Sequence, residues 1–456
     1  MAHQHPSSSD DPAVYFTTLP AIRERCRAVF DIASANRLQY WNVDLSQQDA
    51  IVDFCCALIE RDYGNKYASI PPHGRMRHFV GDRLTPLLER WQDQGRLEAC
   101  RKIVDLLVVS VLLDAGAGSQ WTYRPKQGTE AERINGIGRS EGLAVASLEM
   151  FEQGTFSGKP DDPYRVDALG LSKISTDVIS QGLQVNDENC MTGIEGRANV
   201  LVRLGQVLLD PENQEYFRNR ENVPGQLGLR PGNLIDYLLS HPEAKQMPSA
   251  TSLPISLPVS ALWTIITQGL GGVWPASRTK IDGKAIGDVW PCESLRKRVD
   301  SDTAALVPFH KLSQWLCYSL QEAMQSILGW QFEGTEHQTG LPEYRNGGLL
   351  VDFGLLTIKP EAVLQSLDKP VPSELPRPLD LPPLPASHSA IVEFRAVTVI
   401  MLDRIAEAIR AKLGTKLSLA QVLEAATWKA GREIAKQKRP PVGGPPLAIE
   451  LDGTIF

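Results

Sequence analysis

The residues best suited to bind an anion lie in one short segment, IPPHGRMRHF. His73, Arg75 and Arg77 alternate there, and His78 follows at once. If the chain is extended after its two prolines, alternate side chains share a face, so two guanidiniums and an imidazole converge. Guanidinium groups donate hydrogen bonds in pairs and keep their charge, which suits phosphate oxygens. The segment therefore predicts a phosphate-binding site, with a solvated basic loop as the alternative.

A candidate catalytic carboxylate lies in TGLPEYRNGGLLVDFGLL, residues 339–356. Glu343 stands between a proline and a Gly-Gly pair, and an apolar stretch leads from there to Asp352. Desolvation of a carboxylate beside such a stretch suits acid/base catalysis. The alternative is a buried salt bridge between Glu343 and Arg345 or another neighbour.

Two glycine-flanked turns at predicted helix starts carry further charged groups. GRSEGL contains Arg139 and Glu141, and GIEGR contains Glu195 and Arg197. Backbone N–H groups and the helix dipole favour negative charge at such positions, so these side chains are candidates to line a binding site. For each turn the alternative is an ordinary first helical turn with a surface ion pair.

Aromatic side chains flank these turns and are candidates to stack on planar ligand groups. They are Trp121 and Tyr123 in SQWTYR and Trp274 in GVWPASR, and core packing is the alternative for each. The sequence has no P-loop, GxGxxG, HExxH or Ser/His/Asp motif. Neither spacing nor number of ligands among His73, His78 and Glu141 requires a metal, so we expect neither a metal nor a cofactor.

Helices must position these residues, because apolar side chains recur at i, i+3, i+4 and i+7 through most of the chain. The predicted helices are Asp49–Arg61, Leu97–Leu113, Gly142–Gln153, Ile194–Leu209, Leu312–Leu328, Ala390–Leu413 and Leu419–Lys436. Asp49, Ser140 and Ser418 are predicted to cap three of them. Long alternating patterns are scarce, so strands should be few, short and peripheral. The predicted fold class is mainly α.

Composition limits the class of protein. The 456 residues permit about three domains or one large one. The net charge of -7 and the lack of a long basic run argue against a nucleic-acid or polybasic membrane binder. The most apolar stretch, Leu106–Leu113, is far shorter than the roughly 20 residues that span a bilayer. Seven cysteines without a CxxC pair predict neither a disulfide framework nor a zinc site.

The ends and the proline-rich segment bear on domain organisation. Residues 1–14 lack the apolar core of a secretory signal, which predicts a flexible leader and a protein of the cytoplasm, with the nucleus as a further location. Residues 370–385, PVPSELPRPLDLPPLP, cannot hold a helix. They are either a linker between domains or an extended strap across the surface of one.

Several of these segments together resemble the uracil catabolism protein 4 family. The resemblance runs from about Tyr15 to the C-terminus and rests on IPPHGRMRHF, SQWTYR, GRSEGLAVASLEMFEQGTF, GIEGRANVL, WPASR, LVPFHKLSQWLCYSL and GLPEYRNGGLLVDFGLL. This family is associated with a pathway that releases nitrogen from uracil through ribosylurea. The resemblance implies a role in pyrimidine degradation.

A more distant likeness is to queuosine 5′-phosphate N-ribosylhydrolase, the queuosine salvage glycosylase. Its Ala-Asp-Tyr-Arg-Val-Pro-Gln run parallels residues 342–348, which puts Glu343 in the place of a functionally important aspartate. Residues 392–396 resemble its Glu-Ile-Arg-Ala segment, and Trp428 also has a counterpart. The likeness implies one helical domain over residues 15–456, similar to helical DNA glycosylases, in which residues 370–385 are a strap.

Together the two resemblances imply hydrolysis of the N-glycosidic bond of ribosylurea, as its 5′-phosphate, to urea and ribose 5-phosphate. Glu343 is then expected to stabilise the oxocarbenium-like transition state, with Asp352 or Glu141 on the ribose hydroxyls. Arg75, Arg77 and Arg139 are expected to hold the phosphate, and the other charged and aromatic residues above, with Tyr344 and Arg345, to line the site. The substrate is thus a small phosphorylated ribosyl compound; no nucleic acid or membrane is expected as a partner.

One departure from the salvage enzyme supports an alternative. Ser319 stands where that family has an acidic residue that helps to bind its base. The change fits a smaller leaving group, urea, and equally a lost activity. The alternative is therefore a non-catalytic nucleotide-binding or scaffold protein that gathers other enzymes of the uracil pathway. A nucleic-acid glycosylase follows only from the likeness of fold, and the acidic charge balance argues against it.

Overall fold

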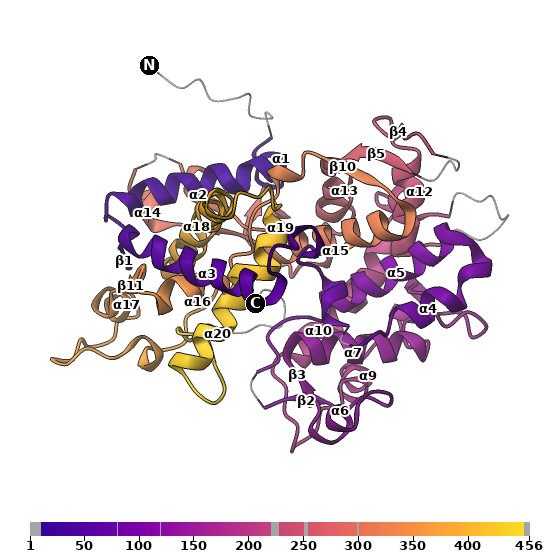
Figure 1. The fold of residues 1–456 in the computed structure, drawn as a ribbon, viewed down its shortest axis with the longest axis horizontal. Coiled ribbons are helices and arrows are strands. Elements are labelled where there is room, and N and C mark those ends of the chain that lie inside the picture. Colours follow the sequence, from indigo (N-terminus) through magenta and orange to yellow (C-terminus); the bar gives the residue numbers. More distant parts are fainter. Residues whose placement is uncertain are drawn as a thin grey trace. The chain divides into compact units, whose positions relative to one another are not determined.

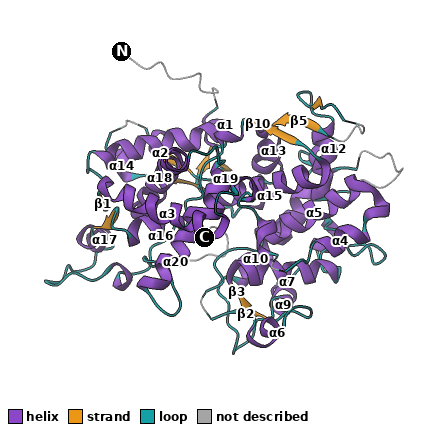
Figure 2. Cartoon of the chain, in the orientation of Figure 1, coloured by secondary structure: helices purple, strands orange, loops and turns teal. Residues whose placement is uncertain are grey.

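The computed structural model describes residues 11–79, 81–118, 120–219, 228–249, 254–298 and 301–450. Helices predominate in this part of the chain and its strands are short (Figures 1 and 2), which confirms the mainly α class. The chain forms two compact units, each assembled from separate segments. Of the described residues, those within 11–73, 277–311 and 336–450 form unit 1, and those within 74–276 and 312–335 form unit 2.

The predicted domain organisation is not decided by this division. The single domain over residues 15–456 stays a prediction, as does the likeness to helical DNA glycosylases. The proline-rich residues 370–385 lie within unit 1. Residues 1–10 of the predicted leader lie outside the described residues, and helix α1 begins at Pro12.

Unit 1 consists mainly of helices around one long central helix. Its helices are α1 (Pro12–Phe16), α2 (Leu19–Ser34), α3 (Gln48–Tyr63), α14 (Glu293–Arg296), α16 (Asn346–Asp352), α17 (Pro360–Ser366), α18 (Ser389–Leu413), α19 (Leu419–Val422) and α20 (Trp428–Lys438), with the π-helical turn η11 (Leu423–Thr427). Its strands are β1 (Trp41–Val43), β6 (Lys280–Ile281), β7 (Lys284–Ala285), β8 (Val289–Pro291), β9 (Leu306–Pro308) and β11 (Leu356–Ile358), which pair antiparallel as β1–β11, β6–β7 and β8–β9.

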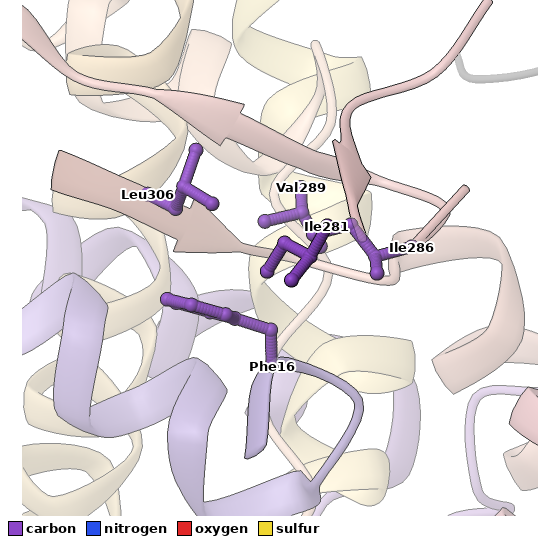
Figure 3. Close-up of a cluster of buried hydrophobic side chains, with 5 residues drawn as sticks. All are labelled: Phe16, Ile281, Ile286, Val289 and Leu306. Carbon is purple, nitrogen blue, oxygen red and sulfur yellow. The ribbon is translucent and has the colours of Figure 1, made fainter. Parts of the chain in front are cut away.

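The central helix α18 packs against α2, α3 and α16. The side chain of His388 accepts the backbone N–H of Ala390 at its start, and Gly414 ends it in the left-handed conformation. A smaller apolar cluster joins α1 to the hairpins β6–β7 and β8–β9 (Figure 3). It consists of Phe16, Ile281, Ile286, Val289 and Leu306.

Unit 2 is built around α5, whose residues from Ala99 to Leu112 are all buried, as expected for a helix surrounded by others. Its helices are α4 (Thr85–Arg90), α5 (Gly95–Leu112), α6 (Glu130–Asn135), α7 (Arg139–Glu152), α8 (Ala168–Leu171), α9 (Thr176–Gly182), α10 (Ile194–Leu209), α11 (Gln214–Phe217), α12 (Leu234–Leu239), α13 (Val259–Thr264) and α15 (Lys311–Leu328), whose first residue belongs to unit 1. Its strands are β2 (Thr122–Tyr123), β3 (Ile137–Gly138), β4 (Lys245–Gln246), β5 (Ile255–Pro258) and β10 (Gln331–Glu333), which form the pair β2–β3 and the sheet β10–β5–β4.

Six of the seven predicted helices are present as single helices, with ends that differ by at most three residues. The seventh, predicted over Leu419–Lys436, is divided into α19, the π-helical turn η11 and α20. Of the predicted caps, Ser418 is confirmed: its side chain accepts the N–H of Gln421 in a capping box. The other two predictions are wrong. Asp49 lies in the first turn of α3, and Ser140 lies inside α7, whose N-cap is Gly138. Helix α3 starts at Gln48 and helix α7 at Arg139, one and three residues before the starts that the apolar periodicity predicts.

Candidate functional site

Glu343 closes a tight turn at the start of α16. Its side chain is 5% exposed. One carboxylate oxygen, Oε2, accepts the main-chain N–H of Arg345 at 2.8 Å, and the other, Oε1, accepts that of Asn346 at 2.7 Å. The alternative of a salt bridge to the Arg345 guanidinium is therefore wrong, because the contact is with its main chain. The carboxylate is held in one position by the backbone that follows it.

A second layer of polar contacts holds this turn. Asn346 donates its side-chain N–H to the carbonyl of Leu341 at 3.0 Å, and Arg395 donates to that of Pro342 at 3.3 Å. Arg395 also binds both oxygens of Asp288, at 2.7 and 2.6 Å. Burial alone would raise the pKa of Asp288, but attraction to Arg395 and several hydrogen bonds hold that pKa well below its usual range. The turn thus rests on a buried, bidentate ion pair.

Close helix packing brings α20 to the same turn. A Cβ atom on Gly431 would lie 2.2 Å from the carbonyl oxygen of Arg345, so only glycine allows α16 and α20 to approach this closely. Gly347 allows α16 to approach α18, because a Cβ atom there would lie 2.2 Å from the ring of Phe394. The close contact at Gly431 places Arg345 beside the first turn of α20.

The Arg345 side chain is 6% exposed and contacts aromatic rings. Its guanidinium carbon lies 5.0 Å from the centre of the Tyr344 ring and 5.7 Å from that of Trp428. Among the described residues, no carboxylate, carbonyl or hydroxyl group forms an ion pair or hydrogen bond with this guanidinium. Within the part of the chain that the structure describes, Arg345 is thus a largely buried cation that contacts aromatic rings and no counterion.

The indole ring of Trp428 contacts cationic and titratable side chains from three segments of the chain. The His73 ring lies 5.3 Å from its ring centre, and the guanidinium carbon of Arg432 lies 4.8 Å from it. The π-helical turn η11 comes immediately before Trp428 and contains Glu424. Such turns are rare and occur frequently at functional sites. We call His73, Arg345, Glu424, Trp428 and Arg432 the Trp428 cluster; all five belong to unit 1.

His73 and Glu424 form a close pair within this cluster. Nδ1 of His73 lies 2.6 Å from Oε2 of Glu424, and the imidazole is nearly fully buried. The main-chain N–H of His73 also donates to the carbonyl of Ala420, so the ring is fixed from both backbone and side chain. A carboxylate on Nδ1 orients the imidazole ring and favours a proton on that nitrogen.

The predicted convergence of side chains in IPPHGRMRHF is wrong. Residues Arg75–His78 form a 3₁₀ turn, η3, so alternate side chains do not share a face. The chain also passes from one unit to the other within this segment: His73 belongs to unit 1, and Arg75, Arg77 and His78 belong to unit 2.

Arg75 is fully buried and is engaged with groups of unit 2. It donates to the hydroxyl of Ser110 at 2.8 Å and the carbonyl of Ser140 at 3.1 Å, and it pairs with Asp114 at 3.0 Å. Burial lowers the pKa of Arg75, against the opposing attraction of Asp114 and Glu141. Its contacts join η3 to α5 and α7.

The neighbouring basic residues also have protein partners. Arg77 is partly exposed and pairs with Glu322 at 2.6 Å, and His78 packs edge-on against Trp315. Ser319 accepts the main-chain N–H of Arg75 at 2.9 Å and donates to the carbonyl of Trp315. In this chain the residue at position 319 therefore holds η3 against α15.

Several other predicted site residues of unit 2 donate hydrogen bonds to other groups of the protein. Trp121 donates to the carbonyl of Leu183, and Tyr123 donates to Glu149 at 2.9 Å. Arg197 is buried and donates to the carbonyls of Leu113, Ala115 and Gly116 at the end of α5; burial lowers its pKa to about 10.

The remaining predicted residues are placed as follows. Arg139 has a positive φ of 60° and begins α7, where Glu141 is partly buried; Glu195 is exposed and Trp274 is partly buried. In unit 1, Asp352 forms a bidentate ion pair with Arg439 at 2.6 and 2.7 Å. Both oxygens of Asp352 are therefore engaged by protein.

Within unit 1 the structure brings together His73, Glu343, Tyr344 and Arg345 from the predicted set. Sequence reasoning did not single out Glu424 or Arg432. Each lies four residues from Trp428, which has a counterpart in the queuosine salvage enzyme. Residues four apart share a face of a helix, so this spacing could have indicated both side chains. Among the residues that the structure describes, no group of three or more His, Cys, Asp or Glu side chains could hold a metal, and no helix is long and apolar enough to cross a membrane.

Fold and site define a mainly helical protein in which a fixed carboxylate adjoins a cluster of basic side chains on a tryptophan. The model of the family described as protein of unknown function DUF1688 matches residues 15–456. The chain is 40% identical over 463 residues to uracil catabolism protein 4 of Lachancea kluyveri, covering 98% of this chain and 99% of that protein. It is 37% identical over 458 residues to protein urg3 of Schizosaccharomyces pombe, covering 98% and 100%. The chain belongs to this family, which confirms the predicted resemblance to uracil catabolism protein 4.

Proposed function

We propose that the protein acts in uracil catabolism and hydrolyses the N-glycosidic bond of ribosylurea 5′-phosphate to urea and ribose 5-phosphate. The name of the relative in Lachancea kluyveri supports the pathway. In the reaction the bond from C1′ to nitrogen breaks, the oxygen of water bonds to C1′, and the departing urea nitrogen takes up a proton.

The observation that carries the proposal is the fixed carboxylate of Glu343. Positive charge develops on the sugar ring as the glycosidic bond breaks, and an anion already in position stabilises it without reorganisation. Two main-chain N–H groups hold both oxygens of Glu343, at 2.8 and 2.7 Å. Glu343 stabilises the oxocarbenium-like ring and orients the attacking water.

The leaving group needs a proton, and His73 is the group we assign to supply it. Urea is a poor leaving group as an anion, so proton transfer to its nitrogen lowers the barrier. Imidazole is the side chain most often used as a general acid, and Glu424 fixes the ring of His73 through Nδ1. Glu424 therefore acts as a positioning residue for His73.

The test is urea release from purified protein supplied with ribosylurea 5′-phosphate or ribosylurea. Loss of a positioned electrostatic group costs about 3–4 kcal/mol of barrier, so Glu343→Gln should slow turnover at least roughly 100-fold with the fold intact. Glu361, an exposed carboxylate in the first turn of α17, provides a matched control as Glu361→Gln, which should release urea at the normal rate. Near-normal turnover by Glu343→Gln would show that Glu343 does not stabilise the transition state.

A second candidate function, a non-catalytic scaffold protein, is favoured by the proline-rich segment. Val371, Leu375 and Leu379 are large apolar residues exposed along it, four residues apart. A rigid proline-rich chain with spaced apolar side chains suits docking into an aromatic groove of a partner. This candidate predicts ligand binding without urea release, and capture of pathway enzymes that depends on residues 370–385.

A further inference from the structure

We propose that the Trp428 cluster is the phosphate subsite, with Arg345 and Arg432 as the ligands of a sugar phosphate monoester. The inference rests on the proposed function, because it assigns the phosphate of that substrate to particular residues. It replaces the expectation that Arg75, Arg77 and Arg139 bind the phosphate.

The state of Arg345 points to a missing anion. Transfer of a guanidinium from water into a protein interior is unfavourable unless the charge is paired. Contacts with the faces of Tyr344 and Trp428 compensate in part, since cation–π contacts contribute about 0.5–2 kcal/mol. Within the described part of the chain no hydrogen-bond acceptor meets the guanidinium. A bound anion would complete its environment.

Other arginines of unit 1 that lie on aromatic rings make polar contacts with protein groups. Arg395 lies 4.1 Å from the Phe309 ring centre and pairs with Asp288, and Arg404 lies over Phe30 and donates to Gln48 at 2.8 Å. Stacking on a ring therefore does not by itself leave an arginine without a polar partner.

The charges around Trp428 favour an anion further. Arg345 and Arg432 contact the same indole, at 5.7 and 4.8 Å. Three carboxylates of these segments have partners of their own: Glu424 with His73, Glu343 with main-chain N–H groups, and Glu433 with Arg61 at 2.7 Å. An anion bound beside the indole would be attracted by the positive charges of both arginines.

A phosphate monoester fits this arrangement better than a carboxylate. It presents three oxygens with nearly two negative charges, and two planar guanidinium groups can each donate a pair of hydrogen bonds to it. Arg345 follows Glu343 by two residues in the same turn, so the phosphate and the sugar ring would be held by neighbouring residues of one rigid segment. Arg75 and Arg77, in contrast, already pair with Asp114 and Glu322.

The test is direct binding of ribose 5-phosphate, inorganic phosphate and ribose to the full-length protein by calorimetry. Loss of a charge-assisted contact should weaken ribose 5-phosphate binding roughly 10- to 100-fold in Arg345→Gln and in Arg432→Gln. Arg345→Lys, which keeps the charge and loses the planar fork, should be intermediate. Arg404→Gln, the matched control on another ring, and Arg77→Gln should bind like the unaltered protein. Unchanged affinity in Arg345→Gln, or a loss in Arg77→Gln, would overturn the inference.

A measurement on the unaltered protein removes any dependence on the folding of variants. Phenylglyoxal modifies accessible arginines, and mass spectrometry locates the products. Ribose 5-phosphate should protect Arg432, which is partly exposed, and leave the modification of Arg404 unchanged; equal modification of Arg432 with and without the ligand would overturn the inference.

The two proposals fail in different ways. Protection and binding without urea release would support the phosphate subsite and count against hydrolysis. Urea release with an unaltered KM in Arg345→Gln would support hydrolysis and count against the subsite.

Discussion

Arg75 in unit 2 and Arg345 in unit 1 are both buried arginines in segments that the sequence marks as unusual, yet their surroundings are opposite. Arg75 meets a carboxylate, a hydroxyl and a carbonyl, whereas Arg345 meets two aromatic rings and, within the described residues, no polar acceptor. Nε and Nη1 of the first guanidinium are paired with protein groups, although its Nη2 is buried without a hydrogen-bond partner. The second guanidinium has no counterion among the residues that the structure describes.

The comparison separates a structural arginine from a ligand-binding one. A buried cation that is paired with a carboxylate depends on that partner, because breaking such a pair leaves an uncompensated charge in the protein interior. A buried cation that contacts only aromatic rings still has its hydrogen-bond donors to offer a ligand. Residue type is the same in both cases, so the distinction lies in the partners that the fold brings from distant segments.

The largest expected effect is on stability at Asp114. Asp114→Asn leaves the fully buried Arg75 without its carboxylate, so we expect the free energy of unfolding at pH 7 to fall by about 3–5 kcal/mol. Urea unfolding followed by circular dichroism measures it. The control is Asp380→Asn, which breaks the exposed pair with Arg377 and should cost at most about 1 kcal/mol. Equal effects of the two changes would abolish the contrast on which the comparison depends.

A similar loss is expected at Asp288, which holds Arg395 beneath the Glu343 turn, and here it depends on pH. The pKa of Asp288 is lower in the folded protein than the value of about 3.9 expected when unfolded. The stability that it contributes is therefore fully present above that pH and is lost as the pH falls toward the folded value. Asp288→Asn should destabilise the protein at pH 7, and its stability should then fall less steeply between about pH 5 and 3. Parallel curves for the two proteins would contradict this.

Next in size is the expected effect of Glu424→Gln on turnover. Without the carboxylate of Glu424, His73 loses its orientation, so urea release should slow by about 100-fold. A positioning role also predicts that kcat falls while KM changes little, and that Glu424→Asp restores part of the rate. Glu433→Gln, a change nine residues away that affects the pair with Arg61, should alter neither kcat nor KM. An equal loss in Glu424→Asp and Glu424→Gln would indicate a merely structural contribution.

Sequence reasoning recovered the elements of the fold and part of the candidate site. Helical periodicity located α3, α5, α7, α10, α15 and α18 because each buries an apolar face, and the turn at Glu343 stood out because structure breakers enclose it. Sequence reasoning could not predict the pair of His73 with Glu424, because 351 residues separate the two along the chain. The same limit applies to Arg75: nothing near position 75 reveals that Asp114 and Ser110 surround its guanidinium.

The smallest expected effect, on the stability of Arg345→Gln, decides whether the comparison is correct. If Arg345 is an open ligand group, removal of its charge costs only the contacts with Tyr344 and Trp428 and relieves an unpaired buried cation. The free energy of unfolding should then change by less than about 1 kcal/mol, in either direction, when urea unfolding is measured without ligand. Ribose 5-phosphate should raise the stability of the unaltered protein by mass action and that of the variant much less. A loss of several kcal/mol without ligand, like that expected for Asp114→Asn, would make Arg345 a structural residue like Arg75, because only a residue that the fold itself uses is so costly to remove.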